Sequence, residues 1–160
     1  MEENALIQDI RNKIASDIVG YHNYKGDETF LIRRESAYNV LKLLKDEFQF
    51  EMLMDLSAAD YPGRQPRFEV VYHLNSLSRT ARLRIKVPVD EGEEIDSVCA
   101  IWPIANWLER ECWDMFGIKF KNHPDLRRLL MYDEFVGHPL RKDYPINKRQ
   151  PLVKPKHEYR

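Results

Sequence analysis

The stretch RFEVVYHLNSLSRTARLRIKVPV, residues 67–89, decides the fold class. Apolar residues alternate with polar ones over Phe68, Val70 and Tyr72, and the alternation returns downstream over Leu83 and Ile85. A period of two residues is typical of a strand with one buried face. The five residues NSLSR between the two runs have the length of a hairpin loop. We therefore expect two antiparallel strands at the centre of a sheet.

The segments on either side of this hairpin predict helices and further strands. Apolar spacing predicts three helices: one over 3–17, one over 37–48 capped by Ser36, and one from Pro103 to about Phe116 that stops at Gly117. Strands are predicted over Thr29–Arg33 and from near residue 50 to a point before Pro62-Gly63. The expected fold class is α+β, with a small, mostly antiparallel sheet and helices packed on it. We expect residues 1–120 to form this domain and residues 121–160 to form an extended, proline-rich C-terminal tail.

The tail carries prolines, apolar side chains and positive charge together. Five of the nine prolines lie in residues 124–155, and no periodic apolar pattern persists there. From Lys119 onward there are eleven Lys and Arg against five Asp and Glu, a net charge of +6 in a chain of net charge −1. Such a segment has too many leucines and aromatic residues for a solvated linker. We expect it to be ordered by contact with an anionic surface, and to wrap a neighbouring protein.

Composition excludes several kinds of site. The two cysteines, Cys99 and Cys112, cannot supply an iron–sulfur cluster or a cysteine-rich zinc site alone. The glycines form no phosphate-binding loop, and an acidic chain of pI about 6.5 does not favour nucleic acid. The N-terminus lacks the pattern of a signal peptide, and no apolar run is long enough to span a bilayer.

The stretch ERECWDMFG, residues 109–117, places three carboxylates on one predicted helix. Helical spacing puts Glu111 on a face with Ile104, Trp107, Leu108 and Met115, where a carboxylate needs a cationic partner or a raised pKa. One interpretation is an acid–base cluster of Glu109, Glu111 and Asp114. The other is a structural ion-pair network with Arg110 and the arginines of the tail. The second is favoured, because no base, nucleophile or metal-binding spacing accompanies the carboxylates.

Two His-Pro pairs follow, in HPDLRR (123–128) and GHPLRKDYP (137–145). Neither His123 nor His138 has the spacing of a metal site, so a structural hydrogen-bonding role is expected for both. The neighbouring arginines are suited to bidentate pairs with carboxylates of a neighbour.

The segments ERECWDMFGIKFKNHPDLRRLL and GHPLRKDYP closely resemble the signature of one subunit family. Its members are part of the proton-pumping NADH:quinone oxidoreductase, respiratory complex I. That family is the C subunit, in its unfused bacterial form. The resemblance implies a non-catalytic scaffold in the peripheral arm, with no catalytic, cofactor-binding or metal-binding residue of its own. FMN and the iron–sulfur clusters would lie in partner subunits, and the whole complex would pass electrons from NADH to quinone and translocate protons. Many relatives have Gly where this chain has Asn122, and Asn also tolerates a left-handed turn.

The resemblance also implies partners and a location. The main partner would be the D subunit, with the B and I subunits and other peripheral-arm proteins, and no nucleic acid. The chain would meet the membrane only through the complex, on the cytoplasmic face of the bacterial inner membrane. We expect one group of residues to anchor the tail (Glu109, Arg110, Glu111, Asp114) and another to order it against the partner (His123, Arg127, Arg128, His138, Arg141, Lys142, Asp143). Two alternatives stay open: the equivalent subunit of a membrane-bound hydrogenase or of a complex using another electron donor, and a free-standing hydrolase using the acidic cluster.

Overall fold

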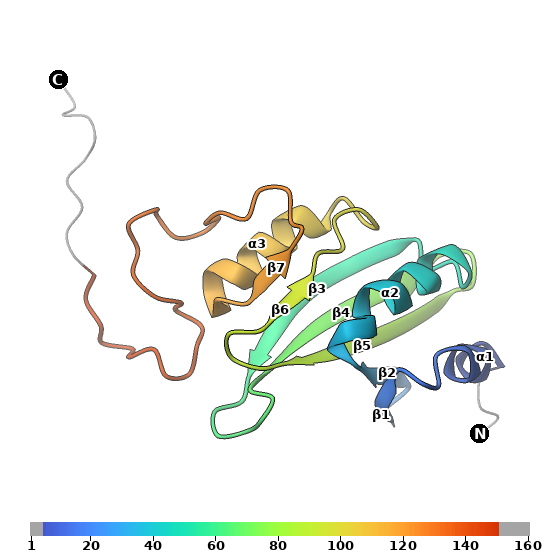
Figure 1. Ribbon diagram of the computed structural model, residues 1–160. Helices are drawn as coiled ribbons and strands as arrows, with labels where there is room; N and C mark the ends of the chain where they lie inside the picture. Colours follow the sequence, from blue (N-terminus) through green and yellow to red (C-terminus); the bar gives the residue numbers. More distant parts are fainter. Residues whose placement is uncertain (1–4, 151–160) are drawn as a thin grey trace.

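The hairpin expected from residues 67–89 lies inside a five-stranded sheet (Figure 1). Strand β4 (Phe68–Ser76) pairs antiparallel with β5 (Ala81–Val89), and β3 (Met52–Asp60) pairs antiparallel with the other edge of β4. The alternate residues of β4 and β5 face the core, as their spacing predicts. The structure is a computed structural model and describes residues 5–150.

The remaining strands make the sheet mixed. Strand β1 (Ile18–Tyr24) forms a hairpin with β2 (Asp27–Ile32), and β2 runs parallel to β5, which gives the order β1-β2-β5-β4-β3. Three of the four pairings are antiparallel, so the predicted α+β class is confirmed. Strand β1 was not predicted, and it begins at Ile18, directly after the range predicted as the first helix.

Helix α1 (Ala5–Lys13) lies toward the β1–β2 end of the sheet, and α2 (Ala37–Asp46) lies across the sheet face at β4 and β5 (Figure 1). Ile7 and Ile10 of α1 are fully buried. The predicted helix over 3–17 is thus shorter at its end, and its first residues lie outside the described range. The prediction that Ser36 caps α2 is wrong: a 3₁₀ turn, η1 (Arg34–Ser36), precedes the helix, and the Ser36 hydroxyl donates to the backbone oxygen of Arg33.

Helix α3 (Ala105–Phe116) packs beside β3 at the opposite end of the molecule (Figure 1). It begins two residues after Pro103 and ends at Gly117, whose φ of 81° is left-handed, as predicted. Two three-residue strands, β6 (Glu94–Asp96) and β7 (Lys119–Lys121), flank it and pair in parallel. Neither was predicted, because three residues show no periodicity.

After β7 the chain doubles back over α3 (Figure 1). The turn starts at Asn122, whose φ of 63° confirms the expected left-handed turn. Residues 122–150, called the tail below, contain no helix or strand. Within residues 5–150, no helix combines the length and hydropathy required to cross a bilayer.

Candidate functional site

The buried face of α3 is more polar than its sequence suggested. Glu109 and Asp114 have no exposed surface, whereas Glu111 and Trp107 are exposed. The predicted placement of Glu111 among apolar residues is therefore wrong. The apolar spacing misled because the true inner face holds carboxylates whose hydrogen-bond partners come from other segments.

Asp114 is the main contact between α3 and the tail. Its Oδ1 lies 2.5 Å from Nη1 of Arg128, and its Oδ2 accepts the backbone N–H groups of Leu129, Leu130 and Met131 at 2.9–3.1 Å. Burial alone would raise the pKa of Asp114, but these hydrogen bonds outweigh it and lower the pKa below its usual value. The carboxylate is thus held ionised, and it fixes a turn of the tail.

Two arginines hold the same turn through backbone carbonyls. Nη2 of Arg128 donates to the carbonyl oxygens of Phe135 and Gly137, at 2.7 and 3.2 Å. Arg110 of α3 donates to the carbonyl oxygens of Arg127 and Arg128, at 3.2 and 3.0 Å. The five donors of a guanidinium in one plane suit this kind of repeated bonding to the main chain. Both charged heads are therefore occupied by groups of the chain itself, and they fix the path of the backbone over residues 127–137.

His138 closes the C-terminal end of α3. Its Nδ1 lies 3.0 Å from the backbone oxygen of Asp114, an acceptor near the helix end where carbonyls lack helical partners. The ring also lies against Gly117: a Cβ at that glycine would approach the imidazole to 2.7 Å. Gly117 therefore serves two purposes, the left-handed turn and the space for His138.

His123 is fixed at the other end of the helix. Its Nδ1 accepts the backbone N–H of Asp125 at 3.0 Å, so the proton of the neutral ring lies on Nε2. That nitrogen donates to the backbone oxygen of Asn106 at 3.1 Å. The hydrogen-bonding geometry expected for both histidines is therefore present.

Glu109 lies 4.0 Å from His123, and with Cys99 these side chains form a cluster with metal-ligand chemistry. Oε1 of Glu109 accepts the backbone N–H of Val98 at 2.7 Å, and Sγ of Cys99 lies 3.5 Å from Oε2. Burial raises the pKa of Glu109, and burial is also the main cause that raises the pKa of Cys99 to about 11. Since the His123 nitrogen facing Glu109 carries a proton, the ring offers no lone pair toward the centre of this cluster in that tautomer. The cluster is a hydrogen-bonded support for the loop before α3.

The second basic cluster of the tail reaches the body at the β3–β4 connection. The Asp60 carboxylate accepts hydrogen bonds from Nε and Nη2 of Arg67 at 2.7 and 2.9 Å. Its Oδ2 also accepts a hydrogen bond from the backbone N–H of Lys142 at 2.7 Å. Asp143 lies 2.9 Å from Arg67, and Arg141 pairs with Glu91. Hydrogen bonding from Arg67 is the largest cause that lowers the pKa of Asp60 and that of Asp143.

Asp60, Arg67 and Glu91 were missed by the sequence prediction. They lie in strand ends and loops, 50 to 82 residues from their partners in the tail, and no local pattern marks them. The one hint is the charge excess of the tail, which requires carboxylates somewhere. Arg127 differs from the other predicted residues: its side chain is 71% exposed and meets only Asp125, at 2.9 Å, among the ion pairs of residues 5–150.

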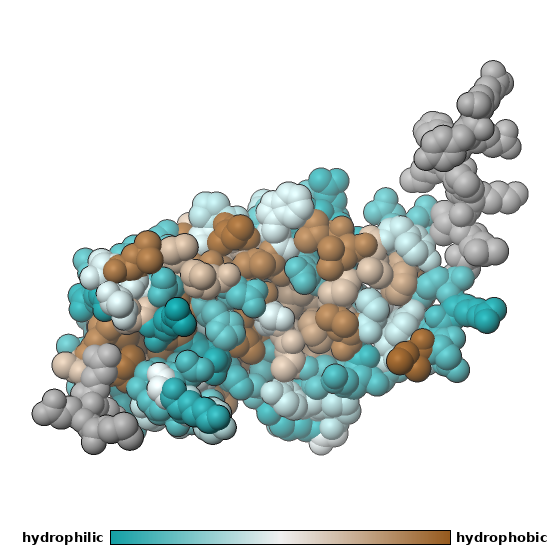
Figure 2. Space-filling model, turned by 180° about the vertical axis from the view of Figure 1, so that it is seen from behind, coloured by the Kyte–Doolittle hydropathy of each residue, from teal (hydrophilic) through white to brown (hydrophobic). Residues whose placement is uncertain are grey.

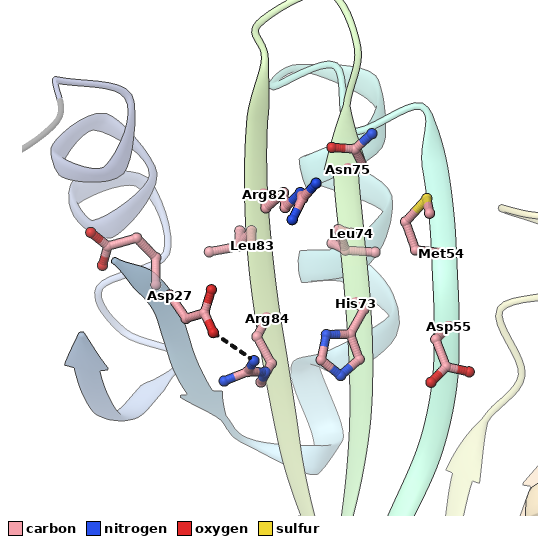
Figure 3. Close-up of a pocket in the computed structure, with 10 residues that line it drawn as sticks. Asp27, Met54, Asp55, His73, Leu74, Asn75, Arg82, Leu83 and Arg84 are labelled. Atoms are coloured by element: carbon pink, nitrogen blue, oxygen red, sulfur yellow. Dashed lines mark hydrogen bonds and ion pairs between the residues drawn. The ribbon is translucent and has the colours of Figure 1, made fainter. Parts of the chain in front are cut away.

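The three carboxylates of the acidic cluster do not converge. Glu109 faces the loop before α3, Asp114 faces the tail, and Glu111 is exposed. A groove with a volume of about 550 Å³ lies elsewhere, on the sheet face that carries Asp55, His73 and Arg84 (Figure 3). None of the predicted site residues lines it. The geometry gives no support to acid–base chemistry by these carboxylates.

Comparison with known proteins gives consistent results. Residues 30–150 match the family described as the respiratory-chain NADH dehydrogenase 30 kDa subunit. The C subunit of the NADH-quinone oxidoreductase of Geotalea uraniireducens is 51% identical over 146 residues, which cover 91% of this chain and 89% of that one. The C/D protein of the same enzyme in Bdellovibrio bacteriovorus is 47% identical over 125 residues, 78% of this chain and 22% of that one. A solved chain from an archaeal membrane-bound sulfane sulfur reductase shares the fold, with a TM-score of 0.76, 20% identity and 96% coverage of both chains.

Proposed function

This chain belongs to the family of the respiratory-chain NADH dehydrogenase 30 kDa subunit, the C subunit of NADH-quinone oxidoreductase, and from that membership we propose that it scaffolds the quinone-reducing module. In this proposal the tail lies along the D subunit, with the B and I subunits nearby. The proposal rests chiefly on one observation: the tail is shaped by α3 and by the β3–β4 connection, through Asp114 and Asp60. A segment fixed in this way presents its outer side chains with little further loss of entropy.

Exposed apolar residues support binding at this end of the molecule. Thirteen large apolar residues are exposed within residues 5–150, and seven of them occur from residue 104 onward. Those seven are Ile104, Trp107, Leu130, Tyr132, Val136, Leu140 and Ile146. Apolar surface concentrated in one region is typical of a protein–protein interface.

The D subunit is proposed as the main partner because a relative combines the two subunits in one chain. The Bdellovibrio C/D protein is matched by this chain over only 22% of its length. A fusion keeps both parts in one molecule, which is favourable only when the parts function side by side.

The chemistry is proposed to belong to the partners. The whole complex would pass electrons from NADH through FMN and iron–sulfur clusters to quinone and couple this to proton translocation, on the cytoplasmic face of the bacterial membrane. The burial of Cys112 and the raised pKa of both thiols suit packing rather than cluster ligation. Identities of 44–51% to several NADH-quinone oxidoreductase proteins favour this enzyme over the complexes that share only the fold.

Purification from the native membrane tests the proposal. The chain is expected to co-purify with the B and D subunits and with an NADH-binding flavoprotein. The Arg127→Ala variant, which removes an exposed guanidinium and no buried contact, is expected to lower the amount of assembled quinone module. Purification of the chain without the D subunit, or with a hydrogenase protein in place of the flavoprotein, would contradict the assignment.

A further inference from the structure

The start of α3 exposes two large apolar side chains on its outer face. Ile104 and Trp107 are 53% and 58% exposed, and a separation of three residues places them on the same side of the helix. We call this pair the α3 anchor. Burial of the large apolar surface of a tryptophan is favourable, and an exposed tryptophan lacks most of this stabilisation.

The anchor is continuous with the tail. Arg110, about one turn further along α3, holds its guanidinium 5.4 Å from the centre of the Trp107 ring. The same guanidinium donates to backbone oxygens of Arg127 and Arg128. The tail then runs past Asp114 with Leu130 still 56% exposed. Figure 2 shows apolar surface between polar groups on the face turned away from Figure 1, up to the end where the tail extends.

The anchor sits at a regular helix, whereas the apolar residues of the tail follow an irregular backbone held by hydrogen bonds. Trp107 belongs to a twelve-residue helix whose opposite face is buried against the core, and Arg110 restrains its ring. A fixed tryptophan ringed by polar groups has the composition of a binding hot spot, because little entropy is lost when it enters a pocket.

We propose that Ile104 and Trp107 insert into an apolar pocket of the D subunit and form the rigid part of the contact that the tail extends. This inference rests on the proposed function, in which the tail lies along that partner. Two observations favour the D subunit as the protein that receives the anchor. Arg110 joins the anchor to the tail, which is proposed to lie along that subunit, and the C/D relative combines both partners in one molecule.

Photo-crosslinking in the assembled complex tests the contact directly. Benzoylphenylalanine is incorporated at position 107, the complex is purified and irradiated, and the crosslinked chain is identified by mass spectrometry. The expected product joins this chain to the D subunit. The matched control carries the same probe at position 24, because Tyr24 is 65% exposed on the edge strand β1, far from α3 (Figure 1). The control is expected to give no product with the D subunit.

A binding measurement tests how much Trp107 contributes to the affinity for the D subunit. Trp107→Ala is expected to weaken binding of the full chain to the purified D subunit about 30-fold or more, the loss typical of a hot-spot residue, while Trp107→Phe keeps most of the affinity. The proposed contact of the α3 anchor is overturned if position 107 crosslinks to another protein of the complex or to a second copy, or if Trp107→Ala binds with unchanged affinity. In either case, co-purification with the D subunit would still support the proposed scaffold function. Absence of the D subunit from the wild-type complex overturns the proposed function itself.

Discussion

Nη1 of Arg128 lies 2.5 Å from Oδ1 of Asp114, a carboxylate with no exposed surface, fourteen residues earlier in the chain. The pair links the last turn of α3 to the tail, and the second carboxylate oxygen fixes three consecutive backbone N–H groups. Because the Asp114 carboxylate is fully buried and the Arg128 side chain is 14% exposed, the charge of each has little access to water in place of the other.

Asp114→Asn is expected to lower the free energy of unfolding by about 3 kcal/mol, since the Arg128 charge loses its buried partner. Urea denaturation measures the change, and trypsin cleavage after Arg128 should become faster. The matched control is Asp125→Asn, which breaks the exposed ion pair with Arg127 and should cost under about 0.5 kcal/mol. Similar losses in the two variants would show that Asp114 does not hold the tail.

The pH dependence of stability should reveal the same carboxylate. The pKa of Asp114 is lowered in the folded chain, so its contribution is present above the ordinary aspartate value of 3.8 and is lost as pH falls through the lowered pKa. Between about pH 5 and pH 2, the unfolding free energy of the wild type should therefore fall more steeply than that of Asp114→Asn. Parallel curves from urea denaturation at several pH values would contradict this.

Glu109 should act in the opposite direction. Burial raises its pKa, so protonation favours the folded state at low pH, and that advantage disappears as pH rises through the raised value. Glu109→Gln mimics the neutral acid and can still accept the Val98 N–H. The difference in melting temperature, variant minus wild type, should grow as pH increases from about 4 to about 8. A difference that is constant across this range would mean that folding does not raise the pKa of Glu109.

Gly117→Ala tests the space beside His138. A left-handed alanine costs about 1–2 kcal/mol, and forcing a methyl group against the imidazole should add about 1–3 kcal/mol. Gly92→Ala is the matched control, because its φ of 85° is similar and the site is open. Thermal unfolding should show the larger loss at Gly117, and adding His138→Ala to that variant should recover part of it. Equal losses at the two glycines would exclude the contact.

Features set by neighbouring residues were predictable from the sequence. The β4–β5 hairpin follows from an alternation and a short loop, and the end of α3 follows from a glycine that permits a left-handed turn. Strand β1 escaped prediction because IVGYHNY alternates weakly and adjoins an amphipathic helix. The strands β6 and β7 are too short to leave a pattern.

The inner face of α3 could not be predicted from the helix alone. Glu109 and Asp114 are tolerated in the interior because Val98 and the tail supply hydrogen-bond donors, and those donors are 11 to 17 residues away. The contact of Asp60 with Lys142 spans 82 residues. Such pairs exist only once the tertiary fold is formed, so the charges can be counted in the sequence while their pairing cannot be read from it.

The order in which the chain leaves the ribosome gives the Asp114 contact a further consequence. Domains fold from the N-terminal side during synthesis, so α3 emerges before residues 128–131, which solvate its last carboxylate. A product terminated just after β7 would carry Asp114 with neither Arg128 nor the backbone donors, beside an exposed Trp107. The tail closes the helix end only when translation has passed it, so a chain that stops before residue 128 leaves Asp114 without its hydrogen-bond donors.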